Sequence, residues 1–201
     1  MPNWCSNTLT LRHEDPAMLK RVEDAIERQE LLAEFVPVPK ELTETVAGSH
    51  SDANEQAALV AQEKSNLEKY GYANWYDFCV GEWGTKWDVD AEAIMATETS
   101  IDLSFDSAWS PPIGWYEKMT ELGFDVDAYY YEPGSAFCGH WYDGCDEYYE
   151  IGSTSEETRA NVPQDIDEMF SISDSQYEWE QENRDELQAW IEDGAEARKE
   201  E

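Results

Sequence analysis

Residues 105–119 read FDSAWSPPIGWYEKM, with two adjacent prolines between Trp109 and Trp115. The residues just before them, ETSIDLSFD (98–106), alternate polar and apolar side chains, which predicts a strand ending at Asp106. The apolar side chains that share one face of this strand are Ile101, Leu103 and Phe105. A ligand clamp needs converging polar groups, which this stretch does not provide, so we interpret the two tryptophans as packing residues.

The two prolines predict the start of a helix. Ser110 is a candidate N-cap, and prolines suit the first helical turn because no amide donor is missed there. The helix should end near Leu122, since Gly123 is a typical residue at which helices stop. The stretch therefore predicts a corner at which a strand turns into a helix.

Alternation continues downstream in three further predicted strands. Pro133-Gly134 predicts a turn, and Asp143-Gly144 is a strong signal for a two-residue hairpin. The strands are predicted at residues 124–132, 135–142 and 145–151. In FDVDAYYYE and CDEYYE the alternation points the aromatic side chains to one side of the predicted strands. The acidic side chains predicted to lie elsewhere are Asp125, Asp127, Asp146 and Glu150.

The first forty residues contain one strand and one helix. CSNTLTLR (5–12) alternates and predicts the strand. Asp15 is a candidate N-cap followed by Pro16, and apolar residues at helical spacing predict a helix from Pro16 to about Glu30. FVPVP (35–39) is an extended connector, because its prolines cannot donate hydrogen bonds to a sheet.

The other segments predict an insertion and a C-terminal extension. Residues 40–70 read as an insertion with helix in its second half, and residues 71–84 as a short aromatic helix that Asn74 could cap. Residues 152–164 are polar and are interpreted as a loop. A last helix is predicted from about residue 182 to about residue 193, with docking side chains Leu187, Trp190 and Ile191.

The order of these elements predicts an α+β fold. It consists of an antiparallel sheet with helices on one face, plus a helical insertion at about 40–70. We assign residues 1–151 to this domain and residues 152–201 to an acidic C-terminal extension with a docking helix.

Four scattered cysteines in a mid-sized chain do not make a disulfide framework. The N-terminus, MPNWCSNTLTLR, lacks the pattern of a signal peptide, and no apolar run approaches the length of a membrane span. We therefore expect a cytoplasmic protein with reduced thiols.

The spacing Cys138-x-His140-x4-Cys145 is the one metal-like pattern. A structural zinc takes four ligands, and neither Asp143 nor Cys79 is specified as the fourth, so we predict no metal and no cofactor. A small enzyme using Cys138 and His140 is an alternative on residue types alone. Neither an orienting third group nor an oxyanion site can be identified, so we expect no catalytic residues.

Five segments in order resemble one protein family: MPNWCSNTL (1–9), FVPVPKEL (35–42), YGYANWYDFCVGEWGTKWD (70–88), FDSAWSPPIGWYEKM (105–119) and YYYEPGSAFCGHW (129–141). The sequence resembles the YubB ferredoxin-like family, the Api-like proteins of phages and plasmids, over roughly residues 1–151. The resemblance implies a ferredoxin-like fold without an iron–sulfur cluster, carried by mobile elements. It does not supply an activity or catalytic residues to carry over.

Charge is the most informative property of the chain. It has 46 acidic and 13 basic residues, a net charge of -33, yet 41% of its residues are hydrophobic and 13% are aromatic. The apolar content indicates a folded core, while the charge disfavours binding to nucleic-acid backbones or anionic membranes, which require lysine and arginine.

A fixed array of carboxylates could instead mimic the charge of DNA and occupy the basic groove of a nucleic-acid-binding host protein. A nuclease, a restriction enzyme or a CRISPR effector would suit a protein of a mobile element. The alternative is a soluble accessory protein adapted to high salt. The carboxylates of such a protein would spread evenly over its surface instead of forming one continuous face. The predicted partner-binding residues are Asp88, Asp90, Glu92, Asp143, Asp146, Glu147, Glu150, Asp165, Asp167 and Glu168.

Overall fold

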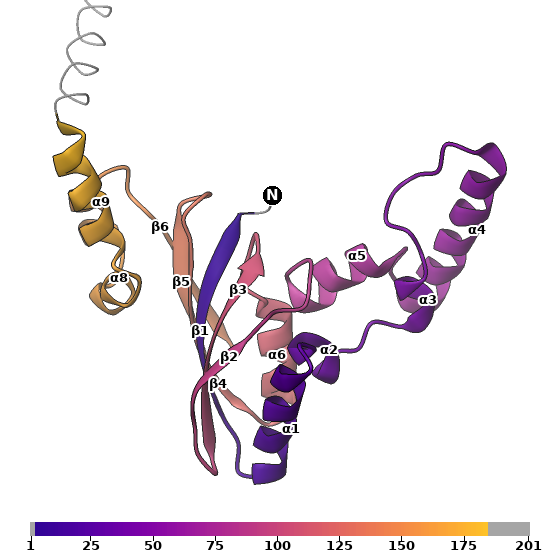
Figure 1. Ribbon diagram of the computed structural model, residues 1–201, viewed down its shortest axis with the longest axis horizontal. Helices are drawn as coiled ribbons and strands as arrows, with labels where there is room; N and C mark the ends of the chain where they lie inside the picture. Colours follow the sequence, from indigo (N-terminus) through magenta and orange to yellow (C-terminus); the bar gives the residue numbers. More distant parts are fainter. Residues whose placement is uncertain (1–2, 185–201) are drawn as a thin grey trace, which may run out of the picture. The chain divides into compact units, whose positions relative to one another are not determined.

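The computed structural model describes residues 3–184 (Figure 1). The strands are β1 (Trp4–Arg12), β2 (Glu92–Ala96), β3 (Ser100–Ala108), β4 (Asp125–Glu132), β5 (Phe137–Tyr142) and β6 (Cys145–Glu150). The helices are α1 (Pro16–Glu27), α2 (Leu31–Phe35), α3 (Lys40–Thr43), α4 (Ala53–Tyr70), α5 (Trp75–Phe78), the π-helix η1 (Cys79–Trp83), α6 (Ile113–Glu121), α7 (Ser155–Asn161), α8 (Gln164–Phe170) and α9 (Ile172–Glu182).

The six strands form one sheet in the order β2-β3-β1-β4-β5-β6. Strand β1 is central and runs antiparallel to both β3 and β4, and β2 runs antiparallel to β3. With α1 between β1 and β2, and α6 between β3 and β4, the first four strands follow the ferredoxin-like βαββαβ topology. The predicted α+β, ferredoxin-like fold is therefore confirmed.

One face of the sheet packs against α1 and α6 (Figure 1). Leu9 of β1 lies opposite Leu103 of β3 and Ala128 of β4, and all three are fully buried. Helix α1 covers them with buried Leu19, Val22 and Ala25, and α6 with buried Trp115, Tyr116 and Met119. Alternation along the strands fixes which side chains enter this core, because a strand changes face at every residue.

The corner between β3 and α6 differs from the prediction in two respects. Strand β3 continues past Asp106 to Ala108, and α6 begins at Ile113 with Pro112 at the N-cap position, so Ser110 does not cap the helix. The residue before a proline is kept out of helical conformation, and Ser110 and Pro111 both precede prolines. The helix therefore starts only after the second proline.

Other local predictions hold with shifted ends. The Asp15 side chain accepts a hydrogen bond from Ala17 N as predicted, but α1 ends at Glu27, three residues before the predicted end at Glu30. Gln29 takes the left-handed region at φ 57°, which cannot continue a helix. In the predicted hairpin, Asp143 and Gly144 have φ 50° and 74°, the signs that a type I′ turn requires.

Several elements were not predicted, among them α2, β2, α7, α8 and α9. Strand β2 lies at the edge of the sheet, and α7 occupies part of residues 152–164, so the prediction of a loop there is wrong. Helix α7 is capped by Thr154, whose side chain accepts a hydrogen bond from Glu157 N. The predicted helix at about residues 182–193, with Leu187, Trp190 and Ile191, falls almost wholly outside the described residues.

The described part of the chain divides into two units. The first contains residues 3–135 and 139–147, and the second contains residues 136–138 and 148–184. The second unit has its own small core, in which Val162, Ile166 and Ile172 are buried. The predicted domain boundary after residue 151 stays a prediction.

Candidate functional site

The face of the sheet opposite α1 and α6 carries aspartates and hydroxyl groups. We call this surface of β1, β3 and β4 the open face. Thr10 of β1 lies between Asp102 of β3 and Asp127 of β4 in the strand register. One end of the open face carries Asp106 opposite Ser6, and the other end carries Asp125 opposite Arg12.

Cross-strand contacts hold these carboxylates in place. Ser6 Oγ donates to Asp106 Oδ1 at 2.9 Å, and Thr10 Oγ1 donates to Asp102 Oδ1 at 2.8 Å. The guanidinium of Arg12 lies 3.3 Å from Asp125 Oδ2. Since a carboxylate has about four acceptor positions, each group keeps capacity for further donors.

His140 of β5 extends this arrangement. Its Nε2 lies 2.8 Å from Asp127 Oδ1, and its ring stacks on Tyr129 with ring centroids 3.9 Å apart. The sequence pattern placed Asp127 away from the aromatic side chains. In the structure Tyr129 shares the face of Asp127, whereas Tyr130 is buried on the other face of β4. The four aspartates of the open face were not among the predicted site residues, although the alternation around them was the signal.

The hairpin of β5 and β6 brings several predicted residues together. A pocket of about 330 Å³ is lined by His140, Tyr142, Asp143, Cys145 and Glu147. Asp146 instead accepts a hydrogen bond from the hydroxyl of buried Tyr130 at 2.7 Å, so it lies on the other face of the hairpin from Glu147. The predicted residue Glu150, at the end of β6, is exposed.

The first predicted acidic segment has a largely structural geometry. Asp88 is half-buried, and it accepts hydrogen bonds from the backbone N–H groups of Leu32, Ala33 and Val89. Burial raises the pKa of Asp88, and these hydrogen bonds oppose the shift. Asp90 is exposed and accepts from Gln29, and Glu92 is exposed on β2.

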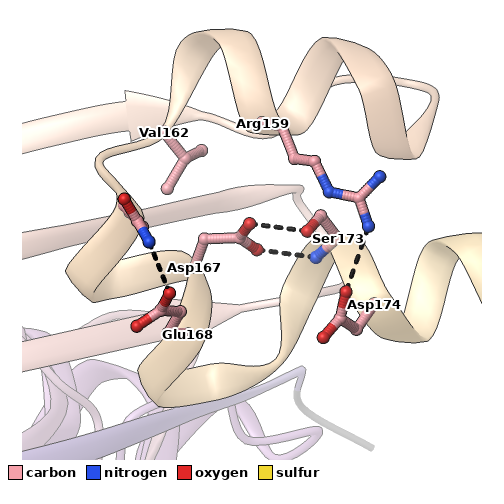
Figure 2. A pocket seen from close by; sticks show the side chains of 7 residues that line it. Arg159, Val162, Asp167, Glu168, Ser173 and Asp174 are labelled. Carbon is pink, nitrogen blue, oxygen red and sulfur yellow. Dashed lines mark hydrogen bonds and ion pairs between the residues drawn. The ribbon is translucent and has the colours of Figure 1, made fainter.

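The last predicted segment lies in the second unit, beside a pocket of about 330 Å³ (Figure 2). Asp167 accepts hydrogen bonds from both N and Oγ of Ser173, and Arg159 pairs with Asp174 at 3.0 Å. Glu168 accepts from Gln164, and Asp165 is exposed. Asp167 therefore holds the start of α9, because the first amides of a helix lack partners within it.

The burial of the cysteine thiols bears on the alternative hypothesis of a small enzyme that uses Cys138 and His140. Cys138 is buried, and burial raises the pKa of its thiol to about 12. A thiol in that state stays protonated near neutral pH, which disfavours Cys138 as the nucleophile of a Cys138/His140 pair. Among residues 3–184, no group of three or more His, Cys, Asp or Glu side chains is placed to hold a metal ion. The absence of zinc stays a prediction.

Comparisons with known proteins are sparse. No family model and no curated protein matches the sequence. A solved structure, the protein api92 from Yersinia pseudotuberculosis, is similar with a TM-score of 0.41 and 10% sequence identity, over 76% of this chain and 99% of that chain. A similarity of this extent assigns neither an activity nor a partner. None of the helices described between residues 3 and 184 is long and apolar enough to cross a membrane.

Proposed function

We propose that this protein is a binding protein whose carboxylates occupy the basic surface of a nucleic-acid-binding protein. The observation that carries the proposal is the open face, where Asp102 and Asp106 of β3 and Asp125 and Asp127 of β4 lie in register with β1, the strand between them. Its arginine and its neighbouring histidine are each already paired with one of these aspartates. A basic partner therefore meets a surface with an excess of negative charge.

Preorganisation is the second support. The hydroxyl groups of Ser6 and Thr10 fix two of the carboxylates before any partner arrives. Binding then orders fewer side chains, and each side chain that is already ordered saves conformational entropy. Freely rotating surface glutamates would lack this advantage.

The partner class follows from the charge and from the resemblance to phage- and plasmid-encoded proteins. A net charge of -33 repels nucleic acid directly but attracts the proteins that bind it. Mobile elements encounter host nucleases, restriction enzymes and CRISPR effectors. We propose one of these as the partner, and inhibition by occupation of its DNA-binding groove as the outcome, without turnover by this protein.

The test removes charge from the open face without changing side-chain shape. Partners captured from a bacterial lysate at low salt would be purified, and their affinity measured with the quadruple variant D102N/D106N/D125N/D127N. The loss of four charge pairs at the rim of the interface should weaken binding about 30-fold. Duplex DNA should release the wild-type complex, and affinity should fall steeply as salt rises.

A matched variant controls for total charge. Glu68, Glu117, Glu156 and Glu178 are exposed and lie off the open face, so E68Q/E117Q/E156Q/E178Q removes the same charge elsewhere. This control should bind nearly as well as the wild type. Equal losses in both variants, or affinity that ignores salt and DNA, would show that the open face is not the recognition surface.

Adaptation to high salt is the second candidate function. It is favoured by exposed acids that also occur on helices, such as Glu68 on α4 and Glu178 on α9. Under this alternative, no captured basic protein would distinguish the two quadruple variants. The same measurement therefore decides between the two functions.

A further inference from the structure

A second surface of the first unit has the opposite chemistry to the open face. A groove of about 340 Å³ is lined by apolar side chains, among them Val38, Trp75, Trp83 and Trp87, together with Lys86 and Asp88. We call it the aromatic groove. Asn74 caps α5 and fixes the start of the segment that carries Trp75, and Trp83 Nε1 donates to Val36 O at 2.9 Å. The indole of Trp83 is therefore held rigidly.

Lys86 is the unusual residue of this groove. Its ammonium lies 4.3 Å from the ring centroid of Trp87, 5.2 Å from that of Trp109 and 5.8 Å from that of Tyr76. Most other described lysines and arginines form ion pairs, but no carboxylate of residues 3–184 pairs with Lys86. The rings position the ammonium, and its three N–H donors stay available to an anion.

The other charged group of the groove is already engaged. Asp88 Oδ1 accepts from Leu32 N at 2.8 Å and from Val89 N at 2.9 Å, and Oδ2 accepts from Ala33 N at 2.9 Å. The carboxylate thus supports the backbone at the start of α2. Lys86 is left as the charged group of the groove without a hydrogen-bonded partner.

We propose that the aromatic groove binds a small organic anion with a planar apolar body and one carboxylate. The planar body would stack on the indole rings, and the carboxylate would accept hydrogen bonds from Lys86. The groove holds one ammonium without a carboxylate partner, which matches a single negative charge on the occupant. The net charge of -33 would repel a polyanion more strongly than a monoanion. This binding is separate from the recognition proposed for the open face.

Three indole compounds that differ in one substituent test the proposal. Indole-3-acetate is an anion, indole-3-acetamide is neutral and tryptamine is a cation, so calorimetric titration of each isolates the role of charge. We expect the acetate to bind at least about tenfold more tightly than the acetamide, because hydrogen bonds to charged groups are the stronger ones. Tryptamine should bind most weakly.

Variants of Lys86 locate the site. K86M keeps an unbranched side chain that is one atom shorter and removes the charge, and it should abolish the preference for the acetate while leaving acetamide affinity unchanged. K86R should retain the preference. Lys64 is exposed on α4 and forms no ion pair within the described residues, so K64M is the matched control and should behave as the wild type.

Several outcomes would overturn the proposal: no measurable binding of indole-3-acetate, equal affinities for the three compounds, or an acetate preference that survives in K86M. The variant D102N/D106N/D125N/D127N should bind indole-3-acetate like the wild type. A parallel loss there would place the anion at another site and would also contradict the proposal.

Discussion

At the scale of single residues, burial divides the cysteines into two kinds. Cys5, Cys79 and Cys138 are buried, whereas Cys145 is exposed beside the hairpin turn. Burial raises the pKa of each of the three buried thiols to about 12. A cysteine's chemical availability therefore follows from the face of the strand or helix on which it lies.

We expect iodoacetamide at pH 8 to modify one thiol per native chain, at Cys145, and four per chain in denaturant. The buried thiols stay protonated up to a pKa of about 12, while unfolded thiols ionise near 9.0. Between these values the unfolded state loses protons that the folded state keeps, so stability is present below about pH 9 and falls as the pH rises.

Mass spectrometry counts the labels, and urea unfolding at pH 8 and pH 10 gives the slope. The variant C138S should show a smaller loss of stability between the two pH values than the wild type. Rapid native labelling at Cys138, or identical pH slopes in the two proteins, would contradict the assignment.

At the scale of elements, the corner between β3 and α6 is held by Ser110 through a contact other than a cap. Its Oγ donates to Gly84 O, just after η1. Pro112 occupies the N-cap position of α6, and Trp109 adopts φ 70° before the turn. Ser110 therefore links the aromatic segment of residues 71–84, at Gly84, to the corner between β3 and α6.

The substitution S110A should lower the free energy of unfolding by about 1 kcal/mol, because a typical hydrogen bond is lost. S110D separates the two mechanisms: aspartate is a good N-cap but cannot donate when ionised. We expect S110D to be at least as destabilising as S110A at pH 7 in urea unfolding, and S110T to be milder. Wild-type stability in S110D would restore the capping interpretation.

The sequence predicted elements whose apolar period is plain and missed those without one. β3 and β4 alternate cleanly, and α1 is announced by Asp15 and Pro16. β2 is exposed at every residue, so it carries no alternation, and the buried side chains of α7 are the polar Ser155 and Thr158. When only the spacing of hydrophobic residues is considered, the polar sequence of α7 resembles that of a loop.

The candidate site was predictable only as a charge excess. Asp88 and Asp167 lie in acidic runs that suggested a free surface, yet both accept hydrogen bonds from backbone amides. The pairing of Asp102 with Thr10 depends on the register of two strands far apart in sequence. No local pattern encodes such a register.

At the scale of the whole molecule, self-repulsion opposes folding. The net charge is -33, and salt weakens interactions over distances beyond the Debye length, about 10 Å at 0.1 M and about 3 Å at 1 M. The urea midpoint should therefore rise between about 10 mM and about 1 M NaCl. Binding to a basic partner should weaken over the same range.

The variant E68Q/E117Q/E156Q/E178Q serves as the control for this salt effect. Removing four negative charges should reduce the rise of the midpoint with salt, because less repulsion remains to be screened. A midpoint that does not change with salt in the wild type would mean that the charges are already spaced widely enough to be independent.

The predicted insertion at about 40–70 lies within a longer excursion of the chain between α1 and β2. Two contacts described above close this excursion near its two ends. Trp83 bonds to the Val36 carbonyl 47 residues away, and Asp88 bonds to Leu32 at a separation of 56 residues. Inside this closed excursion, Asn66 of α4 bonds to Thr45 and to the carbonyl of Ala73, so its buried polar contacts are local. Because doubling the length of a flexible loop costs only about 0.6 kcal/mol of closure entropy, residues added to or removed from an excursion anchored in this way should change the stability of the sheet little.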